Sequence, residues 1–578
     1  MKDTVRFIRD LLLPYGTRRR DFVKKVYKKI LKQQGIDENK AIYKETSGSK
    51  SLNYGLWDYK INKQLVILTT KHCLFIANLM KKCCKQAGLN AEVIIEKPQE
   101  GYKDLPHIVI CPQMFKELPK LYVAFQMEQT VSSRWFTDEY YKKLKDSAAV
   151  FDYSLHNIAF LTKKSFDLKK LYYMPISYDK DMYRRYTNTD KQYDVLFYGD
   201  DSCLRRKAIL ESLSKQFDVK VINNLFGDDL YKELSKAKII VNLHYYEGAL
   251  LETTRIYECL SLNTAVIISE KSVDQNEHKD LEKLVDFVEI GDTNSLTKRI
   301  GYYLSNDENI NKKLLSNKNI LADKDATSFE YYFFRFLLAS DNLTFDDFYD
   351  KASSYIHFTN NFWCLGLPEY IERRESFNSS NNCSITYYPG IRHYIGWIGC
   401  GMSYKFLMRK AKELNLPYVM ICEDDVLFSK NFKFSLKIVL EYLIEIHKKW
   451  DVFSGMIVDV NNEANISAVT EYKDLKLVEL DKMVSMVFNI YNRTFLEQLE
   501  QWDSSNRDAD TNTIDRYIEN KCKLNIVTTV PFLVSCKDEL NSTLWGFQNS
   551  QYGGMLKASN VKMLSKIEAY NNSLEQKV

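Results

Sequence analysis

The hydrophobic residues along the chain recur in two alternating patterns. Short apolar runs, such as residues 65–68 and 265–268, are followed or preceded by longer stretches in which apolar residues return at helical spacing, as in residues 74–87. Strands that alternate with helices pair as parallel sheets with helices on both faces. The pattern therefore predicts an α/β fold.

This alternation falls into three series. The first begins near Gln64, the second near Tyr193, and the third follows an aromatic and acidic connection that ends near residue 350. Because 578 residues are too many for one ordinary hydrophobic core, each series is predicted to form its own domain. The predicted division is a basic helical segment at 1–60, Rossmann-like domains at 61–185 and 186–345, and a further α/β domain at 350–578. The parts on either side of residue 350 are expected to work independently.

The composition is that of a globular protein and narrows the class of partners. Hydrophobic residues make up 45% of the chain, and a net charge of +5 over this length gives no reason to expect a nucleic acid partner. The 12 cysteines follow no repeating framework, which favours reduced thiols and a cytoplasmic protein. No apolar run approaches the roughly 18 residues of a membrane-spanning helix.

Two basic amphipathic helices are predicted at the N-terminus, around Arg18, Arg19 and Arg20. Such helices can lie on the inner face of an anionic membrane. They can equally pack on their own protein with the lysines in solvent. Peripheral membrane contact is therefore one of two interpretations of this segment.

Three consecutive carboxylates, Glu423, Asp424 and Asp425, directly follow an apolar run at 416–422. Ligands of open α/β sheets bind beyond the carboxyl ends of such buried strands. Adjacent acids repel one another and raise their own pKa values unless a cation lies among them. Mg²⁺ or Mn²⁺ holding a diphosphate fits this arrangement, because hard cations prefer oxygen ligands. The alternative is an acidic turn that only ends a strand.

Two further motifs precede the acidic run. Residues 367–374 end in paired arginines, and residues 396–403 form a glycine-rich turn into a helix. The order of these motifs resembles the glycosyltransferases of family 25, the lipooligosaccharide and collagen galactosyltransferase group, from about Tyr355 onward. The resemblance implies a GT-A-type domain that binds a nucleotide sugar and Mn²⁺ or Mg²⁺. It implies donor contacts from Arg373, Arg374, Gly399, Ser403, Glu423 and Asp424, and metal ligation by Glu423, Asp424 and Asp425.

A polar loop late in the third series carries two candidate catalytic acids. Asp510 and Asp515 lie at the opening of a helical segment at 514–518. In an inverting GT-A enzyme, a carboxylate so placed can take the proton from the acceptor hydroxyl. Aspartate is also a common helix N-cap, so a structural role is the alternative.

The second series contains a polar helix edge close to a predicted core strand. Glu252, Arg255 and Glu258 recur at threefold spacing, so they share one edge of a helix. They can form a surface ladder of ion pairs. The apolar residues around them and the strand at 264–270 favour a clamp for the ribose and diphosphate of a nucleotide.

The motifs of this series, F-Y-G at 197–199, the run at 238–247 and the run at 251–258, resemble GT-B glycosyltransferases of the CgeB and group-one type. The resemblance implies that the second Rossmann-like domain binds a nucleotide sugar without a metal. It implies that Gly199 and Arg205 line the phosphates, that His244, Glu252, Arg255 and Glu258 face the nucleotide and sugar, and that Glu252 also has a catalytic role.

Polar residues beyond the strand at 121–125 are candidates for the acceptor side of the first domain. These are Glu128, Arg134, Trp135 and Asn157, each of which can also be a local cap or turn partner. The combined hypothesis is a fused pair of glycosyltransferases that adds sugars from nucleotide-sugar donors to a growing surface glycan or glycolipid. Its alternatives are a chain with one catalytic module and one acceptor-docking module, or a glycan-assembly protein that binds without catalysis.

Overall fold

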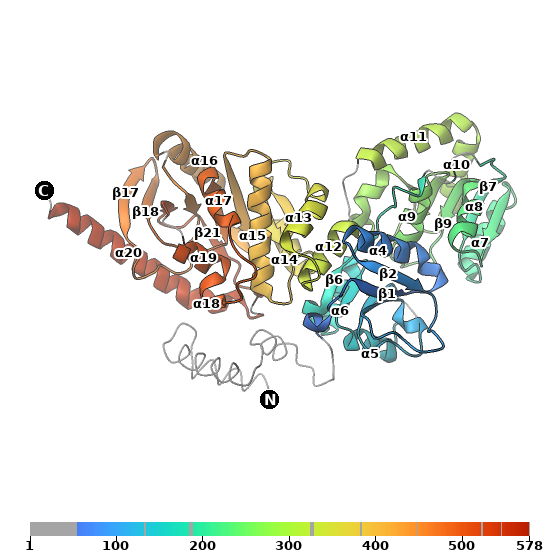
Figure 1. The fold of residues 1–578 in the computed structure, drawn as a ribbon. Helices are drawn as coiled ribbons and strands as arrows, with labels where there is room; N and C mark the ends of the chain where they lie inside the picture. The colour runs from blue at the N-terminus through green and yellow to red at the C-terminus, as the bar shows by residue number, and fades with distance from the viewer. Residues whose placement is uncertain are drawn as a thin grey trace.

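A computed structural model describes residues 55–576, apart from short gaps at 132–134, 184–185, 187–188, 324–328, 382–383, 448, 522–523 and 545. The predicted N-terminal helices and Arg134 lie outside the described residues. Among the described residues, three large sheets with flanking helices and one two-stranded sheet make up the fold (Figure 1). The predicted class, two Rossmann-like domains followed by a further α/β domain, is confirmed.

The first domain is built on sheet A, six parallel strands in the order β2-β1-β3-β4-β5-β6. Its strands are β1 (Gln64–Leu68), β2 (Asn90–Ile94), β3 (His107–Ile110), β4 (Tyr122–Gln126), β5 (Val150–Asp152) and β6 (Leu171–Tyr173), and its helices are α4 (Leu74–Gln86), α5 (Asp138–Asp146) and α6 (Leu155–Lys163). The strand order reverses between β1 and β3. Strands β3 and β4 are buried along their whole length, as expected for a sheet covered on both faces.

The second domain contains sheet B, five parallel strands in the order β11-β10-β9-β7-β8. Its strands are β7 (Tyr193–Tyr198), β8 (Val219–Ile222), β9 (Ala237–Asn242), β10 (Val266–Glu270) and β11 (Asp286–Val288), and its helices are α7 (Leu204–Leu213), α8 (Gly227–Ser235), α9 (Thr253–Leu262), α10 (Thr293–Leu304) and α11 (Asp307–Asp323). Here the order reverses between β7 and β9.

The third domain contains sheet C, in the order β13-β12-β14-β19-β16-β20-β18-β17. Its strands are β12 (Phe362–Gly366), β13 (Thr386–Pro389), β14 (Tyr418–Glu423), β16 (Val452–Ser454), β17 (Ile466–Tyr472), β18 (Leu475–Leu480), β19 (Phe488–Asn492) and β20 (Ile526–Thr529). A separate ribbon pairs β15 (Val426–Phe428) with β21 (Val534–Cys536). Its helices are α14 (Ile371–Ser380), α15 (Gly396–Glu413), α16 (Phe432–Glu441), α17 (Arg493–Glu500), α18 (Ala509–Asn512), α19 (Ile514–Lys521) and α20 (Gly553–Glu575). Strands β13, β12 and β14 are parallel, and the order reverses between β12 and β14.

Helices α12 (Phe329–Ala339) and α13 (Phe345–Ala352) lie between the third domain and the other two (Figure 1). Helix α12 packs on α4 of the first domain, and its Arg335 donates to the carbonyl oxygen of Gly390 at 2.7 Å in the third. The rings of Phe348 and Tyr349 on α13 pack on Phe406 of α15. A cut of the chain near residue 350 would therefore separate α15 from the residues of α13 that cover it.

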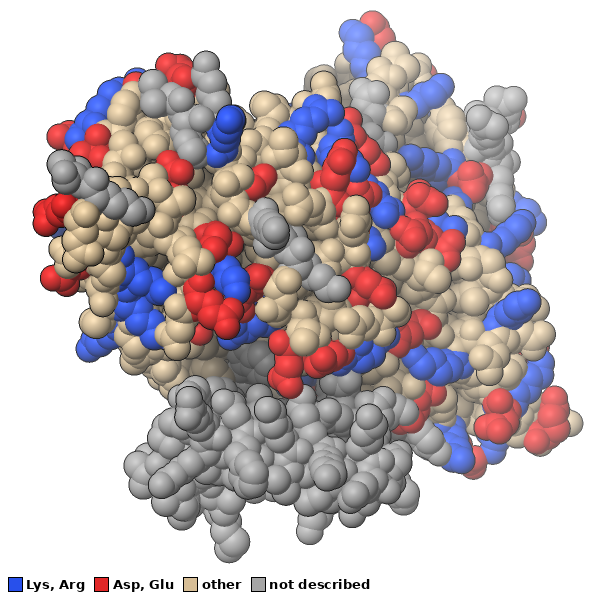
Figure 2. Space-filling model, turned by 60° about the vertical axis from the view of Figure 1, so that its left-hand side comes forward, with Lys and Arg blue, Asp and Glu red and all other residues tan. Residues whose placement is uncertain are grey.

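Charged residues are mixed rather than gathered on the face shown in Figure 2. Lysines and arginines alternate there with aspartates and glutamates, in line with the small net charge of the chain. Among the described residues, no helix has both the length and the hydropathy needed to cross a membrane.

Candidate functional site

Each of the three sheets has one point at which the strand order reverses. In open α/β sheets, ligands bind in the crevice outside the carboxyl ends of the strands at such a point. The residues predicted for the donor, metal and acceptor sites are distributed over all three domains.

A cavity of about 540 Å³ opens beyond the carboxyl ends of β12 and β14. The predicted site residues that line it are Arg373, Ser403, Glu423, Asp425, Asp510 and Asp515. Trp397, Tyr370 and Tyr394 add aromatic surface to its wall. The structure thus brings the acidic run, the first arginine and the late acids to one place, although they are spread over more than 140 residues of sequence.

A cation does lie among the three acids, and it is the guanidinium of Arg373. Its Nε is 2.7 Å and its Nη2 is 2.6 Å from Oδ1 of Asp424, and Nη2 is 3.0 Å from Oδ2 of Asp425. All three side chains are nearly buried. Arg373 was predicted as a donor contact, and the structure gives it the further role of holding the acids together.

One arginine does not compensate three buried carboxylates. Burial, followed by the charge of Asp425, raises the pKa of Glu423 to about 8. Burial also raises the pKa of Asp424 to about 6, even though Arg373 opposes this shift. Oδ2 of Asp424 and Oδ1 of Asp425 are buried without any hydrogen-bond partner. The cluster therefore has both excess negative charge and unused oxygen ligands.

These oxygens fit a divalent cation only in part. Within the described part of the chain, no three His, Cys, Asp or Glu side chains converge as a ready-made metal site. Mg²⁺, however, is usually held by one or two carboxylates together with water and substrate phosphates. Glu423 and Asp425 both line the cavity, and Asp425 offers an unpartnered oxygen, so the residues present fit an ion shared with a diphosphate.

Gly399 and Ser403 shape the loop that follows β13. A Cβ on Gly399 would lie 2.8 Å from the carbonyl oxygen of Ile391, so only glycine lets α15 approach this loop. The buried hydroxyl of Ser403 accepts from the backbone N–H of Ile391 at 2.8 Å. Gly399 and Arg374 are not among the residues that line the cavity, and the Arg374 guanidinium lies 5.4 Å from the ring centre of Tyr387.

The aspartate of this loop that caps a helix is neither Asp510 nor Asp515. Asp508 is the N-cap of α18, and its Oδ1 accepts from the backbone N–H of Asp510 at 3.1 Å. Asp515 lies in the first turn of α19, where the negative charge of its carboxylate stabilises the helix. Asp510 and Asp515 both line the cavity.

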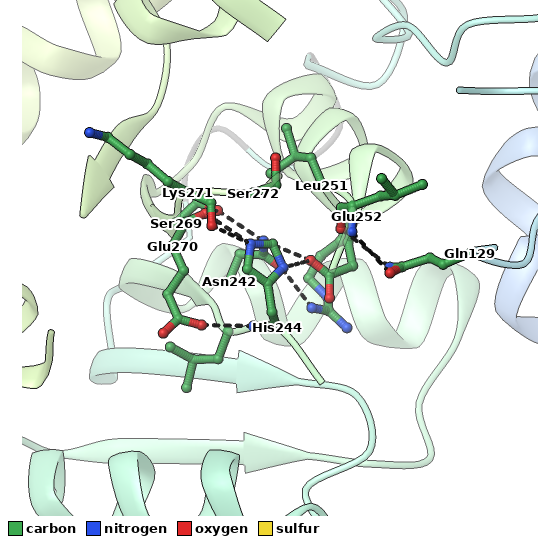
Figure 3. Close-up of polar contacts among 12 residues, drawn as sticks. Gln129, Asn242, His244, Leu251, Glu252, Ser269, Glu270, Lys271 and Ser272 are labelled. Atoms are coloured by element: carbon green, nitrogen blue, oxygen red, sulfur yellow. Dashed lines mark hydrogen bonds and ion pairs between the residues drawn. The ribbon is translucent and has the colours of Figure 1, made fainter. Parts of the chain in front are cut away.

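At sheet B, the ring of His244 lies between a carboxylate and two backbone carbonyls (Figure 3). Its Nδ1 is 2.5 Å from Oε2 of Glu252, and its Nε2 is 3.1 Å from the carbonyl oxygens of both Glu270 and Lys271. Because each ring nitrogen faces only acceptors in these contacts, both must donate, and the ring is an imidazolium. Burial would lower the pKa of His244, but the neighbouring glutamates raise it.

Glu252 is committed to this ion pair. Burial would raise its pKa, but His244 and the two arginines Arg255 and Arg206 lower it to about 2. Asn242 also donates to its carboxylate at 3.2 Å. A carboxylate of such low basicity is a charge partner rather than a proton acceptor.

Replacing His244 with glutamine is expected to change stability in a pH-dependent way. The folded-state pKa of His244 is raised above its unfolded value of about 6.5, so its contribution is fully present below that pH and is lost as the pH rises through the folded pKa. The difference in the free energy of unfolding between wild type and His244→Gln should therefore be larger at pH 6 than at pH 9. Urea titrations at the two pH values measure it, and an equal difference at both would contradict an imidazolium.

The remaining sheet B residues form a cluster of paired charges. Arg205 forms an ion pair with Glu270, and Arg255 donates to Oδ1 of Asn242 at 2.6 Å. Gly199 has a φ of +125°, and a Cβ there would lie 2.8 Å from Nη2 of Arg255. The switch point of sheet B thus brings together five of the predicted residues, Gly199, Arg205, His244, Glu252 and Arg255, with Arg255 beside the backbone turn that follows β7.

Glu258 points away from this cluster. Its carboxylate accepts from the hydroxyls of Tyr198 at 2.8 Å and Tyr231 at 3.0 Å, inside the packing of α9 on α8. Burial raises its pKa to about 7. Glu252 is the N-cap of α9 and pairs with His244, whereas Glu258 lies within the helix and contacts tyrosines, so the two glutamates have different partners.

At sheet A, two of the predicted acceptor-side residues belong to a buried polar network. Asn157 donates to the carbonyl oxygen of Glu128 at 3.0 Å and to Oδ1 of Asp152 at 3.1 Å. Trp135 is 42% exposed. The neighbouring Gln129 forms two hydrogen bonds with the backbone of Leu250, so this edge of the first domain meets the second domain (Figure 3).

Sequence reasoning missed a second cavity, of about 430 Å³, beyond the carboxyl ends of β1, β2 and β3. It includes the aromatic rings of Tyr102 and Phe115, the exposed apolar side chains of Ile95 and Met114, and Phe226 of the second domain. The reversal between β1 and β3 was the available signal, but strand order cannot be read from hydrophobic periodicity alone.

The third domain matches a known family. Residues 374–498 match the model of glycosyltransferase family 25, described as an LPS biosynthesis protein. The match is confined to this segment of the third domain, which is similar to the glycosyltransferases of family 25. The predicted resemblance to family 25 is thereby confirmed for this segment.

One curated relative is the uncharacterised protein L138 of Acanthamoeba polyphaga mimivirus, 30% identical over 106 residues. These residues are 18% of this chain and only 12% of that protein.

Similar solved structures include a DNA-modifying β-glucosyltransferase studied with and without uridine diphosphoglucose, at 13% identity over 48% of this chain and 99% of the other, with a TM-score of 0.34. Sucrose-phosphate synthase of Thermosynechococcus elongatus and Anabaena HepE in complex with UDP and glucose each show 10% identity over 45% of this chain and 94% of the other, with TM-scores of 0.32.

Proposed function

We propose that the third domain transfers a sugar from a nucleotide-sugar donor to an acceptor glycan in the 540 Å³ cavity, with the help of Mn²⁺ or Mg²⁺. The observation that carries this proposal is the acidic cluster at the switch point of sheet C, which has excess charge and two unpartnered oxygens inside a family 25 domain. Burying so much negative charge would cost free energy without a ligand to offset it.

The side chains of this cavity have separable roles in the proposed reaction. Glu423 and Asp425 would hold the cation, which when bound offsets the charge that develops on the leaving diphosphate. Arg373 keeps the acids in position, and because Glu423 has a pKa of about 8, cation binding at neutral pH would release a proton from it. Asp515 or Asp510 would accept the proton of the attacking hydroxyl.

For the first two domains we propose a second, metal-independent donor site at the switch point of sheet B. Gly199 leaves room for the Arg255 guanidinium beside the turn that follows β7. This guanidinium and that of Arg205, which contacts His244 and Glu270 beyond β9 and β10, would offset the charge of a diphosphate. The 430 Å³ cavity of sheet A is lined by aromatic rings, which suit the ring faces of an acceptor sugar, and by lysine and glutamate side chains, which suit its hydroxyls. The acceptor class we propose for the whole chain is a growing surface glycan or glycolipid.

One observation favours the alternative that these two domains only dock the acceptor. His244 with Glu252 and Arg205 with Glu270 already neutralise each other, and Glu252 is too acidic to serve as a base. A donor phosphate would have to compete with Glu270 for Arg205. The docking alternative therefore remains the second candidate.

Chelation separates the two proposed sites in the intact chain. We expect EDTA to stop transfer by the third domain, because Glu423 and Asp425 cannot both stay ionised beside Asp424 without a cation. In the variant Asp425→Asn, any remaining transfer should be insensitive to EDTA. The measurement is mass spectrometry of products from a panel of nucleotide sugars and saccharide acceptors.

The outcomes of the chelation experiment are distinct. If transfer by the wild type continues unchanged in EDTA, the third domain does not need a metal for transfer. If Asp425→Asn shows no transfer at all, with or without EDTA, the result would favour docking over catalysis in the first two domains. Restoration of wild-type activity by added Mn²⁺ or Mg²⁺ is the control for damage by the chelator.

A further inference from the structure

The two carboxylate oxygens of Asp425 are in different states. Oδ2 accepts a hydrogen bond from Nδ2 of Asn549 at 2.8 Å and lies 3.0 Å from Nη2 of Arg373. Oδ1 is buried and has no hydrogen-bond partner. Because two donors already hold Oδ2, Oδ1 is the oxygen of this carboxylate that remains open to a further ligand.

Asn549 is fixed in the position from which it donates. It is 2% exposed, its Nδ2 also donates to the carbonyl oxygen of Lys537 at 3.1 Å, and its backbone N–H donates to the carbonyl oxygen of Leu540 at 2.8 Å. Both contacts of the side-chain amide are with acceptors, so its nitrogen rather than its oxygen must face them. Asn549 thus supplies two hydrogen-bond donors and no charge.

The backbone of Asp425 is held by the ribbon of β15 and β21. Val426, the next residue, pairs with Cys536, and the backbone N–H of Lys537 donates to the carbonyl oxygen of Asp425 at 2.9 Å. Lys537 therefore contacts the aspartate through its N–H and the asparagine through its carbonyl oxygen. These backbone contacts fix the distance between the two side chains.

The other unpartnered oxygen of the acidic cluster is placed differently. Oδ2 of Asp424 would lie 2.6 Å from a Cβ on Gly366, and Asp424 is not among the residues that line the 540 Å³ cavity. Asp425 and Asn549 both line it. Of the two unpartnered oxygens, that of Asp425 is therefore the one that belongs to the cavity wall.

The number of oxygens that a carboxylate can offer bears on which cation it binds. Ca²⁺ takes about six to eight oxygen ligands in flexible geometry and is commonly held by both oxygens of one carboxylate. Mg²⁺ requires near-ideal octahedral geometry and is usually held by one or two carboxylates with water and phosphate, and Mn²⁺ also suits octahedral oxygen sites. A carboxylate with one oxygen already occupied therefore suits Mg²⁺ or Mn²⁺ better than Ca²⁺.

We propose that Asn549 is a specificity-determining residue of the third domain, which favours Mn²⁺ or Mg²⁺ over Ca²⁺ by holding Oδ2 of Asp425. This inference rests on the proposed cation site at Glu423 and Asp425. Asn549 contacts a ligand of the cation and not the cation itself, so it is a positioning residue. It lies beyond residues 374–498, so a part of the chain outside the family 25 match shapes the proposed site.

The test measures the binding of Mn²⁺ and Ca²⁺ to the full chain without substrate. Electron paramagnetic resonance measures free Mn²⁺, and displacement of bound Mn²⁺ gives the Kd for Ca²⁺. Asn549→Leu keeps the approximate shape of the side chain and removes both donors. We expect the Kd for Mn²⁺ to rise by about tenfold and the Kd for Ca²⁺ to stay equal or fall, because Oδ2 becomes available as a second ligand. The matched control is Asn560→Leu, which replaces an exposed asparagine of α20.

The ratio of the two Kd values decides the outcome. A ratio in Asn549→Leu equal to that of wild type would overturn the inference, even if both cations bind more weakly, because a purely structural role would weaken both alike. Near-ultraviolet circular dichroism checks the fold, and Asn549→Ala, with the same expected change of the ratio, replaces the leucine variant if that variant does not fold. Asp425→Asn tests the proposed site itself: if wild type binds Mn²⁺ no better than this variant, the proposed cation site is overturned as well.

Discussion

Replacing Asp425 with asparagine is expected to reduce kcat for transfer by the third domain by roughly 100- to 1,000-fold, the range for removing one group that stabilises transition-state charge. Asp425 lines the cavity and has one unpartnered oxygen, so it is the acid best placed to share a cation with a substrate diphosphate. Asparagine keeps the shape of the side chain and can still accept the hydrogen bond from Asn549, which is 2.8 Å long in the wild type. The fold should therefore survive.

The measurement is steady-state kinetics with increasing Mn²⁺, together with near-ultraviolet circular dichroism as a check of the fold. Asp538→Asn is the matched control, because Asp538 is an exposed acid of the neighbouring segment that does not line the cavity. A kcat and a Mn²⁺ dependence equal to those of wild type would show that Asp425 does not take part in transfer.

The second large effect concerns stability. Arg335→Met should lower the free energy of unfolding by about 3–5 kcal/mol, because it leaves the carboxylate of Glu369 buried without its main partner. Arg335 is 1% exposed and forms two hydrogen bonds with Glu369 and a third with the carbonyl oxygen of Gly390. The pKa of Glu369 would lose the main cause that lowers it to about 2, while the burial that raises it stays.

Urea titration followed by tryptophan fluorescence measures this change. Lys103→Met removes one partner of an exposed ion pair with Glu92 and is expected to leave the titration unchanged. If Arg335→Met behaves like this control, the junction between α12 and the third domain does not contribute to stability, and the domains are as independent as the sequence suggested.

Sequence patterns predicted the local features of this protein well. The apolar run before Glu423 is a central strand, and the acids follow its carboxyl end as expected. Periodicity is a property of neighbouring residues, so it identifies strands and helices directly. It could not tell that Glu252 would be the N-cap of α9, or that the hydroxyls of Tyr198 and Tyr231 would donate to a buried Glu258.

What the sequence could not supply was the partner of each charge. Arg373 and Asp424 are 51 residues apart, Arg335 and Glu369 are 34 apart, and Arg392 lies 221 positions after Leu171. Such pairs form only when the sheets have assembled, and no local pattern records them. This is why the sequence did not show that the guanidinium of Arg373 lies beside Asp424 and Asp425.

The position of α12 bears on how this chain could have been assembled or could be redesigned. A helix that covers α4 of the first domain while its Arg335 pairs with Glu369 of the third is part of both domains. A chimera that joins the third domain to another partner would have to bring α12 and α13 along, with its crossover before Phe329 rather than near residue 350. The unit that can be exchanged is thus larger than the domain that family resemblance outlines.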